Sequence, residues 1–278
     1  MSVKIHAVRT GSVQVKKAQR ERRVGGLARV LTDSEWTEWL PIYAWVIDHS
    51  EGILVVDTGE TARTADPDYF PRWHPFYRWS VRMDVKPADE IGPQLSQIGI
   101  KPSDVKTVIL THLHTDHAGG LHHFSDSEIL VHPREWETAR GRLGKLQGYL
   151  PQRWPAWFAP RPVEFRPERL GPFPRSYSLT TAGDVAIVPT PGHTPGHLSV
   201  IVKSGSVSYF LAGDTSYSQE LLLERRPDGV SPKPRVTVET MDQILKYAET
   251  QATVYLPSHD KESGERLRQG SVLSAKSS

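Results

Sequence analysis

The sequence has no cysteine in its 278 residues. This absence excludes disulfide scaffolds, thiol nucleophiles and cysteine-rich zinc sites. The sequence also has no apolar run that approaches the roughly 18 residues of a membrane span, and its first residues lack the apolar core of a signal peptide. We therefore expect a cytoplasmic protein without a membrane partner.

A large charge excess of either sign is missing as well. Lysine and arginine number 34 and aspartate and glutamate number 32, which gives a net charge of +2. So small an excess argues against a nucleic-acid partner. One basic stretch, from Lys16 to Arg23, is interpreted first as a solvated loop and second as a patch for an anionic partner.

Apolar segments that end at a histidine or an aspartate recur along the chain. Because no repeat or low-complexity linker divides residues 1–278, we predict a single domain. The polar tail after about Gly264 is expected to fray. Apolar periodicity and turn residues predict helices at 88–98, 134–140 and 237–250, and strands at 42–47, 53–57, 105–111, 128–132, 185–188, 198–202, 207–212 and 254–256.

The run from His112 to His117, His-Leu-His-Thr-Asp-His, follows the predicted strand 105–111. Imidazole and carboxylate are the metal ligands left to a protein without cysteine. Residues two apart in an extended segment point the same way, so His112 and His114 can hold one ion together. Asp116 and His117 follow the turn and can face a second ion.

Three further candidates, His193, Asp214 and His259, stand at the ends of other predicted strands. Together with the run they make five histidines and two aspartates. That number suits two catalytic ions with an open position for water, whereas a closed structural zinc site needs four ligands. The sequence therefore predicts a dinuclear metal centre.

This pattern resembles the metallo-β-lactamase superfamily, whose motif is H-x-H-x-D-H followed by distant His, Asp and His. Leu54-Val-Val-Asp-Thr-Gly59 also resembles an early motif of that family, and the resemblance spans roughly residues 40–260. It implies an α/β fold, a four-layer αβ/βα sandwich with the metals at one edge. By the resemblance, one ion is held by His112, His114 and His193, the other by Asp116, His117 and His259, and Asp214 bridges them.

Within the superfamily the sequence is most similar to the N-acyl homoserine lactonase group. The hairpin region 40–59 looks like the opening of those enzymes, Tyr217 falls three residues after Asp214, and His259-Asp260 looks like their closing pair. The resemblance implies a small lactone or ester as substrate and two divalent cations, zinc first, with iron, cobalt or manganese as alternatives. It also implies that the Tyr217 hydroxyl stabilises the oxyanion and that Asp116 is the general acid for the leaving oxygen.

Other members of the superfamily fit less well. True β-lactamases usually carry Cys or Ser where this chain has Asp214, flavodiiron proteins carry Glu where it has His114, and glyoxalase II-like thioesterases carry a helical extension. The nearest rival is an arylesterase or a phosphotriesterase on the same metals. A metal-binding sensor or scaffold and a nucleic-acid processing enzyme are the alternatives from other classes.

Two aromatic segments, 69–79 and 149–158, have no counterpart in the resemblance. We interpret them first as core packing or the contact of a possible homodimer, and second as an acyl-chain wall. His197, Asp57 and Asp260 are candidates for supporting the metal-binding side chains. His122 and His123 are expected on the helix after the motif, and surface or packing positions are expected for His6, His49, His74 and His132.

Overall fold

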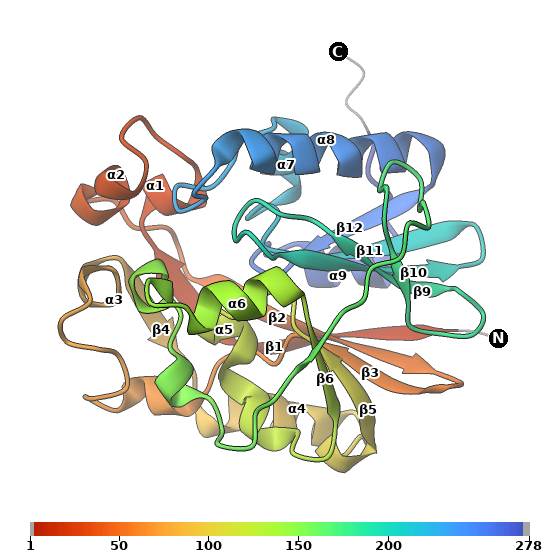
Figure 1. The fold of residues 1–278 in the computed structure, drawn as a ribbon, viewed down its shortest axis with the longest axis horizontal. Coiled ribbons are helices and arrows are strands. Elements are labelled where there is room, and N and C mark those ends of the chain that lie inside the picture. Colours follow the sequence, from red (N-terminus) through yellow and green to blue (C-terminus); the bar gives the residue numbers. More distant parts are fainter. Residues whose placement is uncertain (1–2, 275–278) are drawn as a thin grey trace.

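Two β-sheets face each other in the computed structural model, which describes residues 3–274, and helices cover the outer face of each sheet (Figure 1). The seven-stranded sheet has the order β4-β1-β2-β3-β5-β6-β7, and the five-stranded sheet has the order β12-β11-β10-β9-β8. The layers are therefore helix, sheet, sheet and helix, and the predicted four-layer α/β sandwich is confirmed.

The first sheet contains β1 (Lys4–Val15), β2 (Leu40–His49), β3 (Gly52–Val56), β4 (Val81–Asp84), β5 (Val105–Ile109), β6 (Glu128–Val131) and β7 (Arg161–Pro162). The second contains β8 (Tyr177–Ser178), β9 (Val185–Pro189), β10 (Leu198–Ser204), β11 (Val207–Gly213) and β12 (Thr253–Pro257). The α-helices are α1 (Lys17–Arg20), α2 (Leu27–Thr32), α3 (Pro75–Trp79), α4 (Ile91–Gln97), α5 (Thr115–Ala118), α6 (Pro133–Arg140), α7 (Gln219–Leu223), α8 (Pro234–Thr250) and α9 (Ser263–Gln269).

Strand β2 shows why the first sheet is apolar on both faces. Successive side chains of a strand point to opposite faces. Trp45 and Ile47 enter the core between the two sheets, whereas Ala44 and Val46 enter the core beneath the outer helices. Because both faces are covered, the strand is an apolar run rather than an alternating one.

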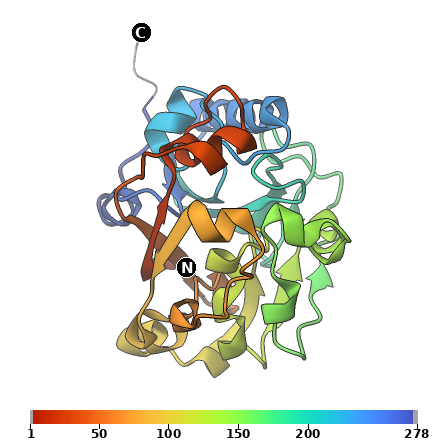
Figure 2. The ribbon, with the colours of Figure 1, turned by 90° about the vertical axis from the view of Figure 1, so that its left-hand side faces the viewer.

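The ends of four strands meet at one edge of the sandwich. Strands β3 and β5 are parallel, with Val56 paired to Ile109, and β11 and β12 are parallel, with Gly213 paired to Pro257. Loops that leave these ends carry the histidines and aspartates of the sequence motifs. Figure 2 shows this edge, where α1 and α2 lie on one side and α3 on the other.

Most predicted elements are confirmed within one to three residues at their ends. The predicted fraying after Gly264 is wrong for residues 265–274, because α9 forms there and Leu273 packs against the core under α8, and the rest of the predicted tail lies outside the described residues. The solvated loop expected at residues 16–23 is also wrong, because Lys16 and Gln19 are buried around α1. No helix in residues 3–274 is both long and apolar enough to cross a membrane.

Candidate metal centre and pocket

The His-rich run begins in an extended segment after β5 and ends in the single-turn helix α5. The carbonyl of His114 accepts from the backbone N–H of Ala118 at 3.0 Å, so the chain turns directly after His114. This local geometry separates the two halves of the run. His112 and His114 come before the turn, and Asp116 and His117 come after it.

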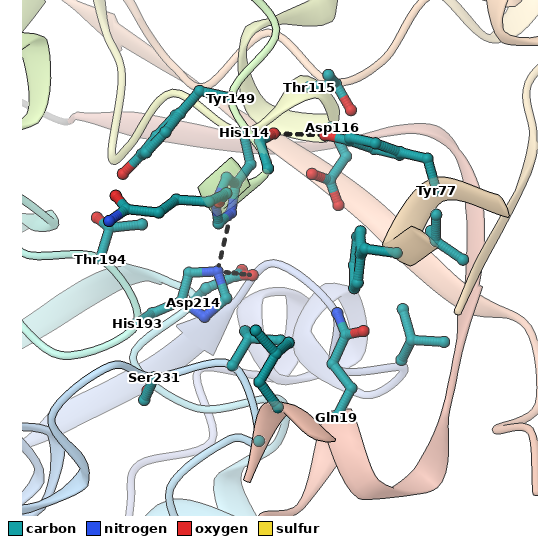
Figure 3. A pocket seen from close by; sticks show the side chains of 18 of the residues that line it. Gln19, Tyr77, His114, Thr115, Asp116, Tyr149, His193, Thr194, Asp214 and Ser231 are labelled. Atoms are coloured by element: carbon teal, nitrogen blue, oxygen red, sulfur yellow. Dashed lines mark hydrogen bonds and ion pairs between the residues drawn. The ribbon is translucent and has the colours of Figure 1, made fainter. Parts of the chain in front are cut away.

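The first half of the run meets His193, which lies in the loop between β9 and β10 of the other sheet (Figure 3). Nε2 of His112 lies 3.0 Å from Nδ1 of His114, which lies 3.1 Å from Nε2 of His193. Burial and the neighbouring imidazoles hold the pKa of His112 well below its usual value and lower that of His114 to about 4. Both rings therefore offer nitrogen lone pairs rather than charge.

The second half of the run meets His259, which follows β12. Nε2 of His259 lies 3.3 Å from Oδ2 of Asp116. Asp214 lies between the two groups, with Oδ1 at 3.4 Å from Nε2 of His117 and Oδ2 at 3.5 Å from Nε2 of His193. Each group thus combines side chains from both sheets.

The electrostatics of the second group favour a bound positive charge. Burial alone would lower the pKa values of His117 and His259, but the surrounding carboxylates, chiefly Asp214, raise the first well above its usual value and the second to about 10. Without a cation, these histidines hold protons instead. Metal binding to histidine displaces such protons.

Two atoms at the centre test whether a cation fits. Nε2 of His117 and Oδ1 of Asp214 are buried and lie 3.4 Å from each other, but neither atom makes a hydrogen bond within residues 3–274. A buried polar atom without a partner is unfavourable unless a ligand satisfies it. Imidazole and carboxylate are also the donors that zinc and similar ions accept. The seven residues therefore have the chemistry of ligands for divalent metal ions.

Asp57 supports the second group, as predicted. It is fully buried, has a left-handed backbone φ of 61°, and its Oδ2 lies 2.8 Å from Nδ1 of His117. The backbone N–H and the hydroxyl of Thr111 donate to the same carboxylate at 2.7 and 2.9 Å. Because a carboxylate accepts, Nδ1 of His117 carries the proton and Nε2 faces the centre.

The other supports differ from the prediction. Asp260 accepts from Arg266 at 2.5 Å rather than from an imidazole, so its predicted role is wrong. Nδ1 of His259 instead donates to the carbonyl of Pro41 at 2.8 Å. Nδ1 of His193 lies 3.1 Å from Oδ2 of Asp228, a residue that the sequence analysis did not identify.

His197 contacts the centre through Asp214. Its Nε2 accepts from the backbone N–H of Asp214 at 3.0 Å, and its Nδ1 lies 2.9 Å from the hydroxyl of Thr190. Gly213, with a φ of 55°, makes this approach possible, since a Cβ there would lie 2.6 Å from Nε2 of His197. His197 thus has the predicted supporting role, which it performs by holding the backbone of Asp214.

Glu135 on α6 is a second support that the sequence analysis missed. Its buried carboxylate accepts from the backbone N–H of Leu113 at 3.0 Å and from Thr194 Oγ1 at 2.8 Å. The backbone N–H of Gly196 donates to it at 3.2 Å. Burial raises the pKa of Glu135 despite these hydrogen bonds. The side chain joins the His-rich run to the loop that carries His193.

The remaining histidines lie outside the centre. Nε2 of His122 and Nε2 of His123 lie 3.0 and 2.8 Å from the same oxygen of Glu90, which are ordinary hydrogen-bond distances. His132 accepts from the backbone N–H of Arg134 at the start of α6. His74 is buried, but it lines the cavity that opens onto the centre rather than only packing in the core.

A cavity of about 370 Å³ opens onto the centre (Figure 3). Its walls come from β1, from α2 and α3, and from both aromatic segments, which contribute Tyr77 and Tyr149. Trp73 and Trp79 of the first segment are instead more than half exposed. The polar side of the cavity includes His114, Asp116, His193, Asp214 and Tyr217, and the apolar side includes Val13, Val15, Leu31, Phe76, Val81 and Met83.

Tyr217 lies in this cavity next to the second group. Its ring stacks on that of His259, with centroids 5.4 Å apart, and its hydroxyl accepts from Nε2 of Gln19 at 2.9 Å. Burial, together with Asp214 and Asp228, raises its pKa well above its usual value. The hydroxyl therefore keeps its proton and can donate it in a hydrogen bond.

Comparison with known proteins gives a consistent set of relatives. The pattern of the metallo-beta-lactamase superfamily matches residues 37–259. An N-acyl homoserine lactonase of Bacillus cereus is 30% identical over 65% of this chain and 66% of its own length, and one of Azorhizobium caulinodans is 27% identical over 93% of both. A solved N-acyl homoserine lactone hydrolase, with the product N-hexanoyl-L-homoserine bound at its catalytic metal centre, superposes with a TM-score of 0.76 at 22% identity, covering 95% of this chain and 96% of its own.

Proposed function

The chain belongs to the metallo-β-lactamase superfamily, and from this premise we propose that it is a metal-dependent hydrolase that opens N-acyl homoserine lactones. The observation that carries the proposal is the pocket, in which an apolar wall leads to the histidine and aspartate centre and to Tyr217. Such a pocket suits a molecule with a polar lactone head and an apolar acyl chain. Relatives that align along most of the chain are named as lactonases of this class.

We assign the binding of two divalent cations to the seven clustered residues. When bound, such cations polarise a carbonyl and lower the pKa of a water molecule towards ~7. Zinc is the first choice for an imidazole and carboxylate site, with iron, cobalt and manganese as the alternatives. The residues proposed for the two ions are His112, His114 and His193 for one, Asp116, His117 and His259 for the other, and Asp214 for both.

Tyr217 is proposed to donate its hydroxyl hydrogen bond to the carbonyl oxygen of the lactone. Negative charge develops on that oxygen when water attacks the carbonyl carbon. A donor that is already oriented stabilises this charge without rearranging at the moment of reaction. Stacking on His259 holds the ring at the edge of the centre.

Asp116 is proposed to carry the proton of the reaction. Burial alone would raise its pKa, but His117 and His259 lower it to about 2, so the side chain is ionised at neutral pH and its oxygen lone pairs are free to receive a proton from the attacking water. The carboxyl then returns this proton to the alkoxide that leaves as the ring opens. Atoms and charge balance, because one water is consumed and one alcohol, one carboxylate and one proton are formed, and the new carboxylic acid releases that proton to the solvent.

The decisive experiment measures proton release from homoserine lactones of short and long acyl chain, from an aryl ester and from a phosphotriester. We expect fast opening of the lactones, lost on chelation and restored by metal. Tyr217→Phe should lower turnover roughly 10- to 100-fold at unchanged metal content, since it removes one oxyanion donor. Slow lactones beside a faster ester or phosphotriester would overturn the substrate assignment.

The oligomeric state, the native metal and the cellular location stay predictions. A homodimer is tested by sedimentation, the native metal by elemental analysis of freshly purified protein, and the cytoplasmic location by fractionation. The exposed Trp73 and Trp79 next to the pocket wall are the first positions to substitute if a dimer forms. The activity proposed above depends on none of these three.

A further inference from the structure

Gln19 joins the amino-terminal part of the chain to Tyr217. It lies on α1, is only 5% exposed, and points into the pocket (Figure 3). Its Nε2 donates to the hydroxyl oxygen of Tyr217 at 2.9 Å, across 198 positions of sequence. The basic stretch therefore contributes the neutral side chain of Gln19 to the pocket, together with the charged Arg22, whose guanidinium donates to the carbonyl of Ser231 at 3.1 Å.

The direction of this hydrogen bond decides what the hydroxyl can do. A tyrosine hydroxyl has a single proton to donate, and it can accept as well. Because the oxygen of Tyr217 accepts from Gln19, its own proton stays available for another acceptor. Within residues 3–274, Tyr217 donates no hydrogen bond.

We propose that Gln19 is a positioning residue that fixes the direction of the Tyr217 hydroxyl, so that its proton faces the carbonyl oxygen of the substrate. This inference rests on the role proposed above for Tyr217. Gln19 itself touches neither the reacting atoms nor the seven clustered residues through a hydrogen bond. It acts by occupying one acceptor position of the hydroxyl.

The backbone of α1 is held firmly enough for this task. The carbonyl of Gln19 accepts from the backbone N–H of Gly229 at 2.8 Å, and Oδ2 of Asp33 accepts from the backbone N–H of Ala18 at 2.8 Å. A Cβ at Gly229 would lie 2.0 Å from the carbonyl of Ala18, so the two backbones are in close contact. Gly229 adjoins Asp228, the partner of His193, and the same loop thus supports both sides of the site.

Stability alone does not account for a glutamine at this position. The Oε1 atom of Gln19 is buried and has no hydrogen-bond partner within the described residues. An apolar side chain of the same size would avoid that unfavourable burial. The contact with Tyr217 is the one side-chain hydrogen bond that Gln19 forms in residues 3–274.

The test compares Gln19→Met and Gln19→Glu, alone and combined with Tyr217→Phe. Methionine keeps the volume and removes the donor, so kcat should fall about three- to tenfold at unchanged KM and metal content. An ionised glutamate would accept the Tyr217 proton itself, so kcat should fall as far as in Tyr217→Phe. In the Tyr217→Phe background, each Gln19 substitution should change kcat less than about twofold, because coupled residues are not additive.

Gln14→Met is the matched control. Gln14 on β1 donates through Nε2 to the carbonyl of Thr37 at 2.8 Å, and it does not reach Tyr217. This control should leave kcat unchanged. Equal losses from Gln19→Met in the presence and absence of the Tyr217 hydroxyl would show that Gln19 acts only through packing. Unchanged or faster turnover in Gln19→Met would show that Tyr217 donates to Gln19, and either result overturns the proposal.

A measurement without substrate separates this inference from the proposed function. The Raman doublet of the tyrosine ring distinguishes a hydroxyl that accepts from one that donates, and the difference between wild type and Tyr217→Phe isolates Tyr217. We expect an accepting hydroxyl in the wild type, whereas a donating one would overturn the proposal even if Gln19 variants fail to fold. If the wild type cleaves the aryl ester but not the lactones, the substrate assignment fails while the kinetic comparison is made on the ester.

Discussion

Asp57→Asn should weaken metal binding without removing any of the seven clustered residues. Asp57 accepts three hydrogen bonds, two from Thr111 and one from Nδ1 of His117. Asparagine is nearly the same size and is among the non-glycine residues that best tolerate a left-handed φ such as the 61° found here. The substitution therefore changes the hydrogen bonding and leaves the backbone in place.

Both orientations of the new amide create a conflict. If its oxygen stays on the backbone N–H of Thr111, its NH₂ group faces Nδ1 of His117, whose proton must move to Nε2. Nε2 is the atom that faces the centre, so a cation bound there would leave the proton on Nδ1, where it points at the new NH₂ group instead of at an acceptor. If the amide is reversed, two N–H donors face each other at Thr111. Changes to such orienting partners typically cost 10- to 100-fold in metal affinity, which corresponds to about 1.4–2.8 kcal/mol.

Competition with a chromophoric chelator measures this affinity directly. Asp242→Asn is the control, because Asp242 on α8 pairs with Arg225 and forms no hydrogen bond or ion pair with the seven clustered residues. We expect the control to bind metal like the wild type. A metal affinity of Asp57→Asn within threefold of the wild type would refute the view that Asp57 sets the tautomer of His117.

Other substitutions test the surroundings of the centre. Burial raises the pKa of Glu60 to about 7 in the fold, so its contribution to stability is present below pH ~4.5 and lost as the pH rises through 7. The unfolding free energy of metal-free Glu60→Gln, measured by urea titration, should therefore rise by about 3 kcal/mol relative to that of the wild type between pH 4.5 and pH 8. A difference in unfolding free energy that stays the same at every pH would contradict this. Gly213→Ala should lower both Tm and metal affinity because its Cβ would lie 2.6 Å from His197, whereas Gly205→Ala, with a φ of 60° and no atom within 4 Å, should lower Tm only slightly. Glu135→Gln should lower the free energy of chemical unfolding by about 1–3 kcal/mol, because the new NH₂ group must face a donor that now bonds to the carboxylate. An unchanged unfolding midpoint would show that these hydrogen bonds do not stabilise the fold.

The sequence predicted the features that depend on neighbours along the chain. The spacing of His112, His114, Asp116 and His117 after an apolar strand indicated which side chains face one another across a turn. The apolar runs also located most strands, because strands buried on both faces carry few polar residues. Strand β1 was not predicted, since its pairing with β2 shifts between Arg9 and Ser12.

The features that sequence reasoning missed depend on contacts between distant elements. Asp228, Glu135 and Gln19 each lie at least 22 positions from the partner that gives them a role in the site. Their spacing follows no local pattern, and a buried carboxylate or amide looks in sequence like a surface residue. Asp260 was assigned wrongly because Arg266, which lies on α9 close by in the sequence, donates to its carboxylate. The distant contact is that of its neighbour His259, whose Nδ1 donates to a carbonyl of β2.

Because each group of clustered residues contains side chains from both sheets, a bound cation would link the two halves of the fold. His112 and His114 follow β5 of the first sheet, and His193 and His259 adjoin strands of the second. A ligand that binds only the folded chain stabilises it by mass action, by about 2.7 kcal/mol at a hundred times its dissociation constant. The supply of metal would then set how often the halves separate, and with it the rate at which proteases cleave the chain.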